Sequence, residues 1–161
     1  MGHYGKFKVA ILGFGVEGKD ALRYFLGQGS TVTVLDKKSL EELERSGFEN
    51  KGITWITGEN YLEAGLKNYD IIVRSPGIYR FLPEIVEAEK NGSKITSNTK
   101  LFFLESEANI IGITGTKGKG STARMLQAAL NHCGYKTLLL GNIGEPMLDR
   151  IEDADTFDWV I

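Results

Sequence analysis

Short apolar runs alternate with amphipathic segments along the whole chain. The apolar, β-branched runs predict strands at Lys8–Leu12, Thr31–Leu35, Tyr69–Arg74, Ile110–Thr114, Thr137–Leu140 and Phe157–Ile161. Apolar residues at three- and four-residue spacing predict helices at Glu17–Gln28, Leu40–Ser46, Leu82–Asn91 and Ser121–Cys133. In the last helix the apolar stripe contains Met125, Leu126, Ala129, Leu130 and Cys133. Alternating strands and helices indicate an α/β protein, in which helices cover a parallel sheet.

The predicted elements fall into two α/β units, residues 1–96 and residues 97–161, with a connector at Asn98–Ala108. The second unit has few strands, and the sequence ends inside the apolar run Phe157–Ile161. We therefore expect a fragment of a longer protein, inactive by itself. We also expect the apolar surface of that last strand to be exposed.

A glycine-rich loop, Gly13–Gly18, follows the first strand and opens the first helix. Gly13 permits a tight turn, Gly15 allows a ligand to approach the backbone, and Gly18 permits close packing of the helix on the strand. Asp36 ends the second strand, where dinucleotide-binding proteins carry a ribose-binding acid. Taken alone, this pattern predicts NAD; a nucleotide-sugar or a purely structural turn are the alternatives.

Two further loops follow predicted strands and would lie at the same kind of sheet edge. Ser75-Pro76-Gly77-Ile78 favours a turn whatever its function, and Gly141-Asn142-Ile143-Gly144 offers an amide side chain for a ligand. Lys37 and Lys38 follow Asp36, either as a solvated strand end or as a clamp for a phosphate.

The strongest motif joins the strand at Ile110–Thr114 to the last helix. Its residues are Gly115, Thr116, Lys117, Gly118, Lys119, Gly120, Ser121 and Thr122. The backbone N–H groups of such a loop bind phosphates, a lysine reaches the β- and γ-phosphates, and a hydroxyl at the helix start coordinates Mg²⁺. The usual form G-x-x-x-x-G-K-[ST] is not met, because Gly120 separates Lys119 from Ser121. The motif nevertheless predicts triphosphate binding, with ATP as the ligand.

The composition argues against several classes of protein. A net charge of −2 argues against binding to nucleic acid, and the absence of a long apolar run argues against a membrane span. Cys133 is the only cysteine, which fits a reducing cytoplasm. With two histidines in all, neither a metal-ligand cluster nor a hydrolase triad can be assembled from the sequence.

The order of these four loops resembles that of the muramyl (Mur) ligases of peptidoglycan synthesis, over essentially the whole chain. The resemblance is greatest to those members that add D-glutamate to UDP-N-acetylmuramoyl-L-alanine. It implies a Rossmann-like, parallel-sheet domain for the UDP-sugar, followed by the start of a central P-loop ATPase domain. A third domain, for the incoming amino acid, would lie beyond this sequence.

The resemblance also implies roles for individual residues. Contacts to the UDP-sugar would come from Gly15, Val16, Glu17, Asp36, Lys37, Ser75, Gly77 and Asn142. Lys119 would be the catalytic lysine at the ATP phosphates. Gly120 stands where these ligases have Ser or Thr, so Ser121 becomes the candidate Mg²⁺ ligand. The full-length enzyme would be a cytoplasmic monomer that forms an amide bond through an acyl phosphate.

Three other functions each agree with part of the sequence. A dehydrogenase would explain the first glycine loop, but it would give no role to the loop at Gly115–Thr122, called the phosphate loop below. A ligase of the folylpolyglutamate type would explain the phosphate loop, whose Lys117 and Gly120 are closer to that group, but not the domain before it. A UDP-sugar-binding module without catalysis would fit the chain as it stands.

Overall fold

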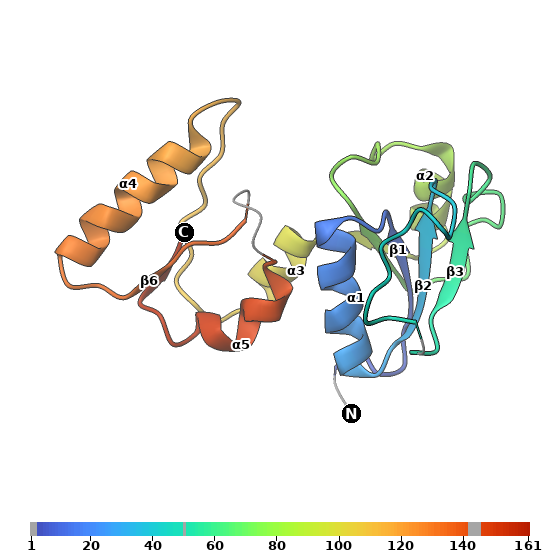
Figure 1. The fold of residues 1–161 in the computed structure, drawn as a ribbon, viewed down its shortest axis with the longest axis horizontal. Coiled ribbons are helices and arrows are strands. Elements are labelled where there is room, and N and C mark those ends of the chain that lie inside the picture. The colour runs from blue at the N-terminus through green and yellow to red at the C-terminus, as the bar shows by residue number, and fades with distance from the viewer. Residues whose placement is uncertain (1–2, 50, 142–145) are drawn as a thin grey trace. The chain divides into compact units, whose positions relative to one another are not determined.

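The computed structural model describes residues 3–49, 51–141 and 146–161. Its chain forms two compact units, Met1–Asn98 and Thr99–Ile161. Both contain parallel strands and helices, as Figure 1 shows. The predicted α/β class is therefore confirmed.

The first unit is built on a parallel sheet of five strands in the order β3-β2-β1-β4-β5. The strands are β1 (Lys8–Leu12), β2 (Thr31–Asp36), β3 (Thr54–Thr57), β4 (Ile71–Arg74) and β5 (Lys94–Thr96). Helix α1 (Val16–Gln28) stands to the left of the strands in Figure 1, and α2 (Pro83–Lys90) lies behind them. Helices on both faces explain why the strands are apolar on both faces.

The central strand β1 shows how the core is divided. Ala10 and Leu12 pack in a cluster with Ile85 and Ala88 of α2. Ile11 points to the other face, where it lies under α1 close to Gly18. Because β2, β1 and β4 run parallel side by side, the segments that follow them emerge at one edge of the sheet. That edge carries the candidate site.

The structure corrects several sequence predictions in this unit. Strands β3 and β5 were not predicted, and the strand expected at Tyr69–Arg74 begins at Ile71. The helix expected at Leu40–Ser46 is wrong, because the segment forms turns. Isolated short helices are unstable, and here the Glu42 carboxylate accepts a hydrogen bond from the N–H of Ser39 within a single turn.

The second unit contains more helix than sheet. Its elements are α3 (Asn98–Glu105), which begins at the last residue of the first unit, α4 (Lys119–His132), β6 (Thr137–Leu138), a 3-10 turn (Leu148–Arg150), α5 (Ile151–Ala154) and β7 (Trp159–Val160). Strands β6 and β7 pair in parallel. Helix α3 replaces the connector expected from the sequence, because Leu101 and Phe102 bury their side chains and hold the turn in place.

Three expectations for this unit are wrong. The strand expected at Ile110–Thr114 is reduced to a single bridge, in which Ile110 pairs with Val160. Val160 and Ile161 are buried rather than exposed. In α4, Ala123 is buried whereas Met125 of the predicted apolar stripe is 73% exposed.

No helix among the described residues is long and apolar enough to cross a membrane.

Candidate functional site

A cavity of about 430 Å³ opens at the carboxyl edge of the first unit's sheet. It lies where β2, β1 and β4 end, which is where open α/β sheets bind ligands. Its lining residues are Gly13, Phe14, Gly15, Val16, Glu17, Asp36, Lys38, Leu43, Ser75, Pro76, Gly77 and Ile78. Both glycine-containing loops of the first unit thus border one cavity.

Two glycines of the first loop are required by space, as predicted. Gly13 has φ +88°, and a Cβ there would lie 2.9 Å from the hydroxyl oxygen of Ser75. A Cβ on Gly18 would lie 2.0 Å from the carbonyl oxygen of Gly13. Gly15 has open space around it and precedes the first residue of α1. The backbone there is free to approach a ligand at the positive end of the helix.

The carboxylate of Asp36 holds the first loop from the neighbouring strand. One oxygen accepts a hydrogen bond from the N–H of Phe14 at 2.6 Å, and the other accepts one from the N–H of Lys38 at 2.8 Å. Both oxygens therefore have backbone partners before any ligand binds. A ribose hydroxyl at Asp36 would have to share these oxygens.

The second loop is tied to the first and to its own strand. The hydroxyl of Ser75 donates to the carbonyl oxygen of Gly13 at 3.2 Å, and the N–H of Ile78 donates to the carbonyl oxygen of Ser75 at 3.1 Å. Arg74, the last residue of β4, donates from Nη1 to carbonyl oxygens of this loop. Sequence reasoning missed Arg74, because in the sequence it is only the polar residue at the end of an apolar strand.

The charges around the cavity are mixed. Burial raises the pKa of the Glu17 carboxyl, and the nearby Asp20 raises it further, while Arg74 acts in the opposite direction. Lys38 lines the cavity. Lys37 does not line it, and its ammonium group forms an exposed ion pair with Glu59 at 3.2 Å. Of the two lysines, the structure thus brings Lys38, rather than the predicted Lys37, to the cavity.

The phosphate loop of the second unit leads into α4. Gly118 precedes the helix with φ +76°, and Lys119 is the first helical residue. The ammonium group of Lys119 donates to the carbonyl oxygen of Gly115 at 2.7 Å, so the lysine folds back over its own loop. The N–H of Thr122 donates to the carbonyl oxygen of Gly118 at 2.9 Å. The loop and the first-turn hydroxyls are exposed to solvent.

A second cavity, of about 220 Å³, lies beside the start of α4. Lys119 and Gly120 line it together with apolar side chains such as Phe102, Ile111 and Met147. The sequence did not predict this cavity, since its walls come from α3 and from the segment around Ile111, whose structures differ from those expected.

The donor and acceptor atoms of the phosphate loop determine which ligands it can hold. The phosphate loop offers backbone N–H groups and the ammonium group of Lys119, which suit the oxygens of a polyphosphate. For a magnesium ion it offers the hydroxyls of Ser121 and Thr122. Mg²⁺ takes oxygen ligands and is usually held by one or two protein groups, phosphates and water. Among the described residues, no group of three His, Cys, Asp or Glu side chains could hold a metal.

The structure assembles most of the predicted residues into two sets. Gly15, Val16, Glu17, Asp36, Ser75 and Gly77 border the first cavity. Residues Gly115–Thr122 form one loop and the first turn of α4. Asn142 lies outside the described residues.

Comparison with known proteins identifies the family. The model of the Mur ligase MurD-like N-terminal domain matches residues 7–97, which is more than half of the chain. The chain belongs to the MurD-like Mur ligases. The matched segment contains the five-stranded sheet and both loops of the first cavity. The family resemblance stated from the sequence is confirmed.

Curated relatives extend the match into the second unit. This MurD-like chain is 36% identical over 156 residues to the UDP-N-acetylmuramoylalanine–D-glutamate ligase of Ruminiclostridium cellulolyticum, covering 96% of the chain and 33% of that protein. It is 37% identical over 148 residues to the ligase of the same name from Clostridium botulinum (strain Okra), covering 91% of the chain and 32% of that protein. The chain spans about a third of the length of these relatives.

A solved structure shares the fold. The pseudomurein peptide ligase type C from Methanothermus fervidus superposes with a TM-score of 0.56 at 22% identity, covering 96% of the MurD-like chain and 32% of the other. At this identity the likeness concerns the fold.

Proposed function

We propose that the full-length protein is an ATP-dependent ligase that adds D-glutamate to UDP-N-acetylmuramoyl-L-alanine. It would serve peptidoglycan synthesis in the cytoplasm, and through it cell wall formation, cell shape and division. The observation that carries this proposal is the presence of two phosphate-type loops in one MurD-like chain. One borders the cavity of the first unit and the other opens α4.

In this proposal the first unit, residues 1–96, binds the UDP-sugar. The start of α1 at Val16 and Glu17 faces the diphosphate, whose charge suits a helix N-terminus. Ser75 and Gly77, with Asp36, contact the rest of the nucleotide. Lys37 and Asn142 complete the set that the family resemblance implies. In the structure Lys38 borders the cavity and is therefore the better candidate for a phosphate contact.

Residues 97–161 begin the ATP-binding domain in this proposal. The substrate carboxylate attacks the γ-phosphorus of ATP, the bond to the bridging oxygen breaks, and ADP leaves. The amino group of D-glutamate then attacks the acyl carbon, and inorganic phosphate leaves. Lys119 would release Gly115 and stabilise charge on the transferring phosphoryl group. Mg²⁺ would neutralise phosphate charge when bound, with the hydroxyl of Ser121 as its candidate protein ligand.

The proposal is tested in two stages. Calorimetry of the 161-residue chain with UDP-N-acetylmuramoyl-L-alanine, ATP and NAD separates the nucleotide classes. We expect binding of the UDP-sugar in preference to NAD. A phosphate-release assay of the full-length protein with ATP, the UDP-sugar and D-glutamate tests the reaction. Tight NAD binding without a response to the UDP-sugar would refute the proposal in favour of a dehydrogenase.

A further inference from the structure

Arg74 makes an unusual set of contacts at the end of β4. Its Nη1 donates to the carbonyl oxygen of Ser75 at 3.1 Å, approaches that of Pro76 at 3.4 Å, and also donates to that of Ile78. One guanidinium nitrogen therefore faces three carbonyl oxygens of a four-residue turn. Hydrogen bonds from a charged donor are stronger than those between neutral groups.

These contacts fix the orientation of the peptide groups in the turn. The C=O and N–H groups of a trans peptide unit point in opposite directions. A carbonyl of Pro76 directed at Arg74 therefore directs the N–H of Gly77 away from the guanidinium. Pro76 and Gly77 both border the cavity of the first unit. Arg74 thus controls which backbone groups of this loop are available to a ligand.

The contacts also hold the turn in one conformation. The N–H of Ile78 closes the turn on the carbonyl oxygen of Ser75, and this oxygen receives Arg74 as well. Gly77 has open space around its Cα and no side chain that would restrict it. A turn of this composition would sample several conformations in the absence of an external tie. The guanidinium supplies that tie from within the strand.

We propose that Arg74 is a positioning residue for nucleotide binding: it sets the Ser75–Ile78 turn in its binding conformation from behind the cavity wall. This inference rests on the proposed function, because it takes the uridine diphosphate group as the ligand. Arg74 acts through the backbone of the turn, and its own side chain is committed to carbonyl oxygens.

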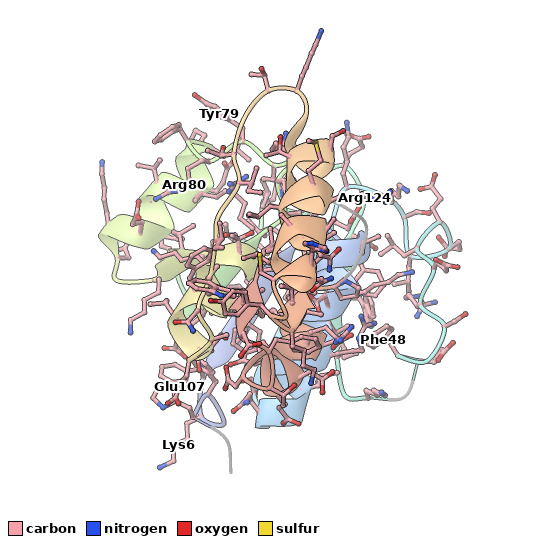
Figure 2. The ribbon with its side chains drawn as sticks, turned by 90° about the vertical axis from the view of Figure 1, so that its left-hand side faces the viewer. Lys6, Phe48, Tyr79, Arg80, Glu107 and Arg124 are labelled. Atoms are coloured by element: carbon pink, nitrogen blue, oxygen red, sulfur yellow. The ribbon has the colours of Figure 1, made fainter. Side chains whose placement is uncertain are left out.

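The test uses the 161-residue chain with substitutions at Arg74 and at a matched arginine. Arg74→Met removes the donors and keeps much of the side-chain length. Arg74→Lys retains a charged nitrogen that can donate to several carbonyl oxygens. The control is Arg80→Met. Arg80 lies in the same segment between β4 and α2 (Figure 2), and its Nη2 bonds both carboxylate oxygens of Glu89 at 2.6 Å.

Two readouts are measured on each variant. The first is the hydrogen-exchange rate of the Ile78 N–H in the absence of ligand. We expect it to rise about tenfold in Arg74→Met and to change little in Arg80→Met and Arg74→Lys. The second is the affinity for UDP by calorimetry. We expect a loss of about tenfold in Arg74→Met, with recovery to within about threefold in Arg74→Lys.

The outcomes separate this inference from the proposed function. Unchanged Ile78 exchange in Arg74→Met, or UDP affinity equal to that of the unsubstituted chain, would overturn the role of Arg74. An equal loss in Arg80→Met would also overturn it, since the effect would then belong to any arginine of the segment. Failure of the unsubstituted chain to bind UDP would overturn both proposals, while exchange at Ile78 still shows whether Arg74 holds the turn.

Discussion

Both units of the molecule carry a glycine loop at the start of a helix, but the two loops are held in different ways. In the first unit the loop lies between two neighbouring strand ends, and Asp36 and Ser75 bond to it from either side. In the second unit the loop is held by a hydrogen bond within itself, which Lys119 donates to the carbonyl oxygen of Gly115. The first loop is therefore shaped by the sheet around it, and the second by its own lysine.

The hydrophobic cores of the two units differ as well. The fully buried side chains of the first unit include Phe25, Leu22 and Ile72, on both faces of a five-stranded sheet. The second unit pairs two short strands, and Met125 on its longest helix is 73% exposed. The comparison indicates that the cavity of the first unit is held by the surrounding sheet, whereas the loop of the second unit is held mainly by its own lysine. Four measurements would break or sharpen this contrast.

The largest effect is expected for the core. Phe25→Ala removes a fully buried ring of α1 and should lower the free energy of unfolding of the first unit by about 3–5 kcal/mol. Met125→Ala on α4 should change stability by no more than about 0.5 kcal/mol, because the side chain is largely exposed. Urea denaturation of the 161-residue chain measures both. A large loss in Met125→Ala would mean that α4 has a buried face on that side.

The next effect concerns catalysis in the full-length protein. Lys119→Ala should lower kcat by about 10²–10³, the scale for removal of one preorganised charge-stabilising donor. The affinity for the UDP-sugar should stay within about twofold, since Lys119 does not border the cavity of the first unit. Phosphate release and calorimetry give the two values. If Lys119→Ala retained a near-normal rate while Lys117→Ala did not, Lys117 would be the residue that contacts the γ-phosphate.

A smaller effect is expected where the helix meets the first loop. Gly18→Ala places a Cβ 2.0 Å from a backbone oxygen and should destabilise the first unit by about 1–3 kcal/mol. Gly27→Ala is the matched control in the same helix, because nothing lies within 4 Å of its Cβ position. There the change should stabilise by about 0.5–1 kcal/mol. Thermal unfolding compares the two, and equal shifts would argue against a tight helix–loop contact.

The smallest effect is electrostatic. The pKa of Glu17 is raised in the folded chain by burial and by Asp20, so the folded state holds this proton more tightly than the unfolded state does. The folded chain therefore becomes less stable as the pH rises above about 4.5, the usual pKa of a glutamate carboxyl, because Glu17 then loses a proton that the folded state holds more tightly. Glu17→Gln should be slightly more stable than the parent at pH 7, by about 0.5 kcal/mol or less, and equal to it at pH 3.

Glu42→Gln provides a control of opposite sign. The N–H and the side chain of Ser39 hold the pKa of Glu42 below its usual value, so its stabilising effect is present at neutral pH and is lost as the pH falls. This variant should be less stable than the parent at pH 7. The same direction of change in both variants would show that the two carboxyl groups do not differ as described.

The sequence predicted the parts of the fold that depend on strong local patterns. The strand at Lys8–Leu12 and the glycines at 13 and 18 could be recognised because apolar period and turn geometry are local properties. Strand β5 (Lys94–Thr96) was missed because three residues are too few to show a period, and it forms by pairing with β4. The strand expected at Ile110–Thr114 is wrong, since the structure has only a single bridge there, from Ile110 to Val160, and an apolar run does not by itself show whether a partner strand pairs with it.

The candidate site also contains residues that the sequence could identify and residues that it could not. Motif spacing singled out Asp36, and the family resemblance singled out Glu17 and Ser75; all three border the first cavity. The sequence could not show that Arg74 contacts the following loop, or that Lys38 rather than Lys37 borders the cavity, because both observations depend on side-chain direction. Lys37 turns to Glu59 and Arg74 turns to the carbonyl oxygens of the following loop. The directions of these side chains depend on neighbouring residues that come close only in the folded chain.

The bond between Lys119 and Gly115 has a consequence for the speed of ligand capture. It joins an exposed loop carbonyl to a side-chain ammonium, so breaking it leaves the hydrogen-bond ladder of α4 intact. Exposed side chains change rotamer in picoseconds to nanoseconds. The lysine can therefore leave the carbonyl many times during one encounter with a polyanion. Under the proposed function, association of ATP at this loop would then be set by diffusion and by the attraction of its two lysines for negative charge, and it would slow as ionic strength rises.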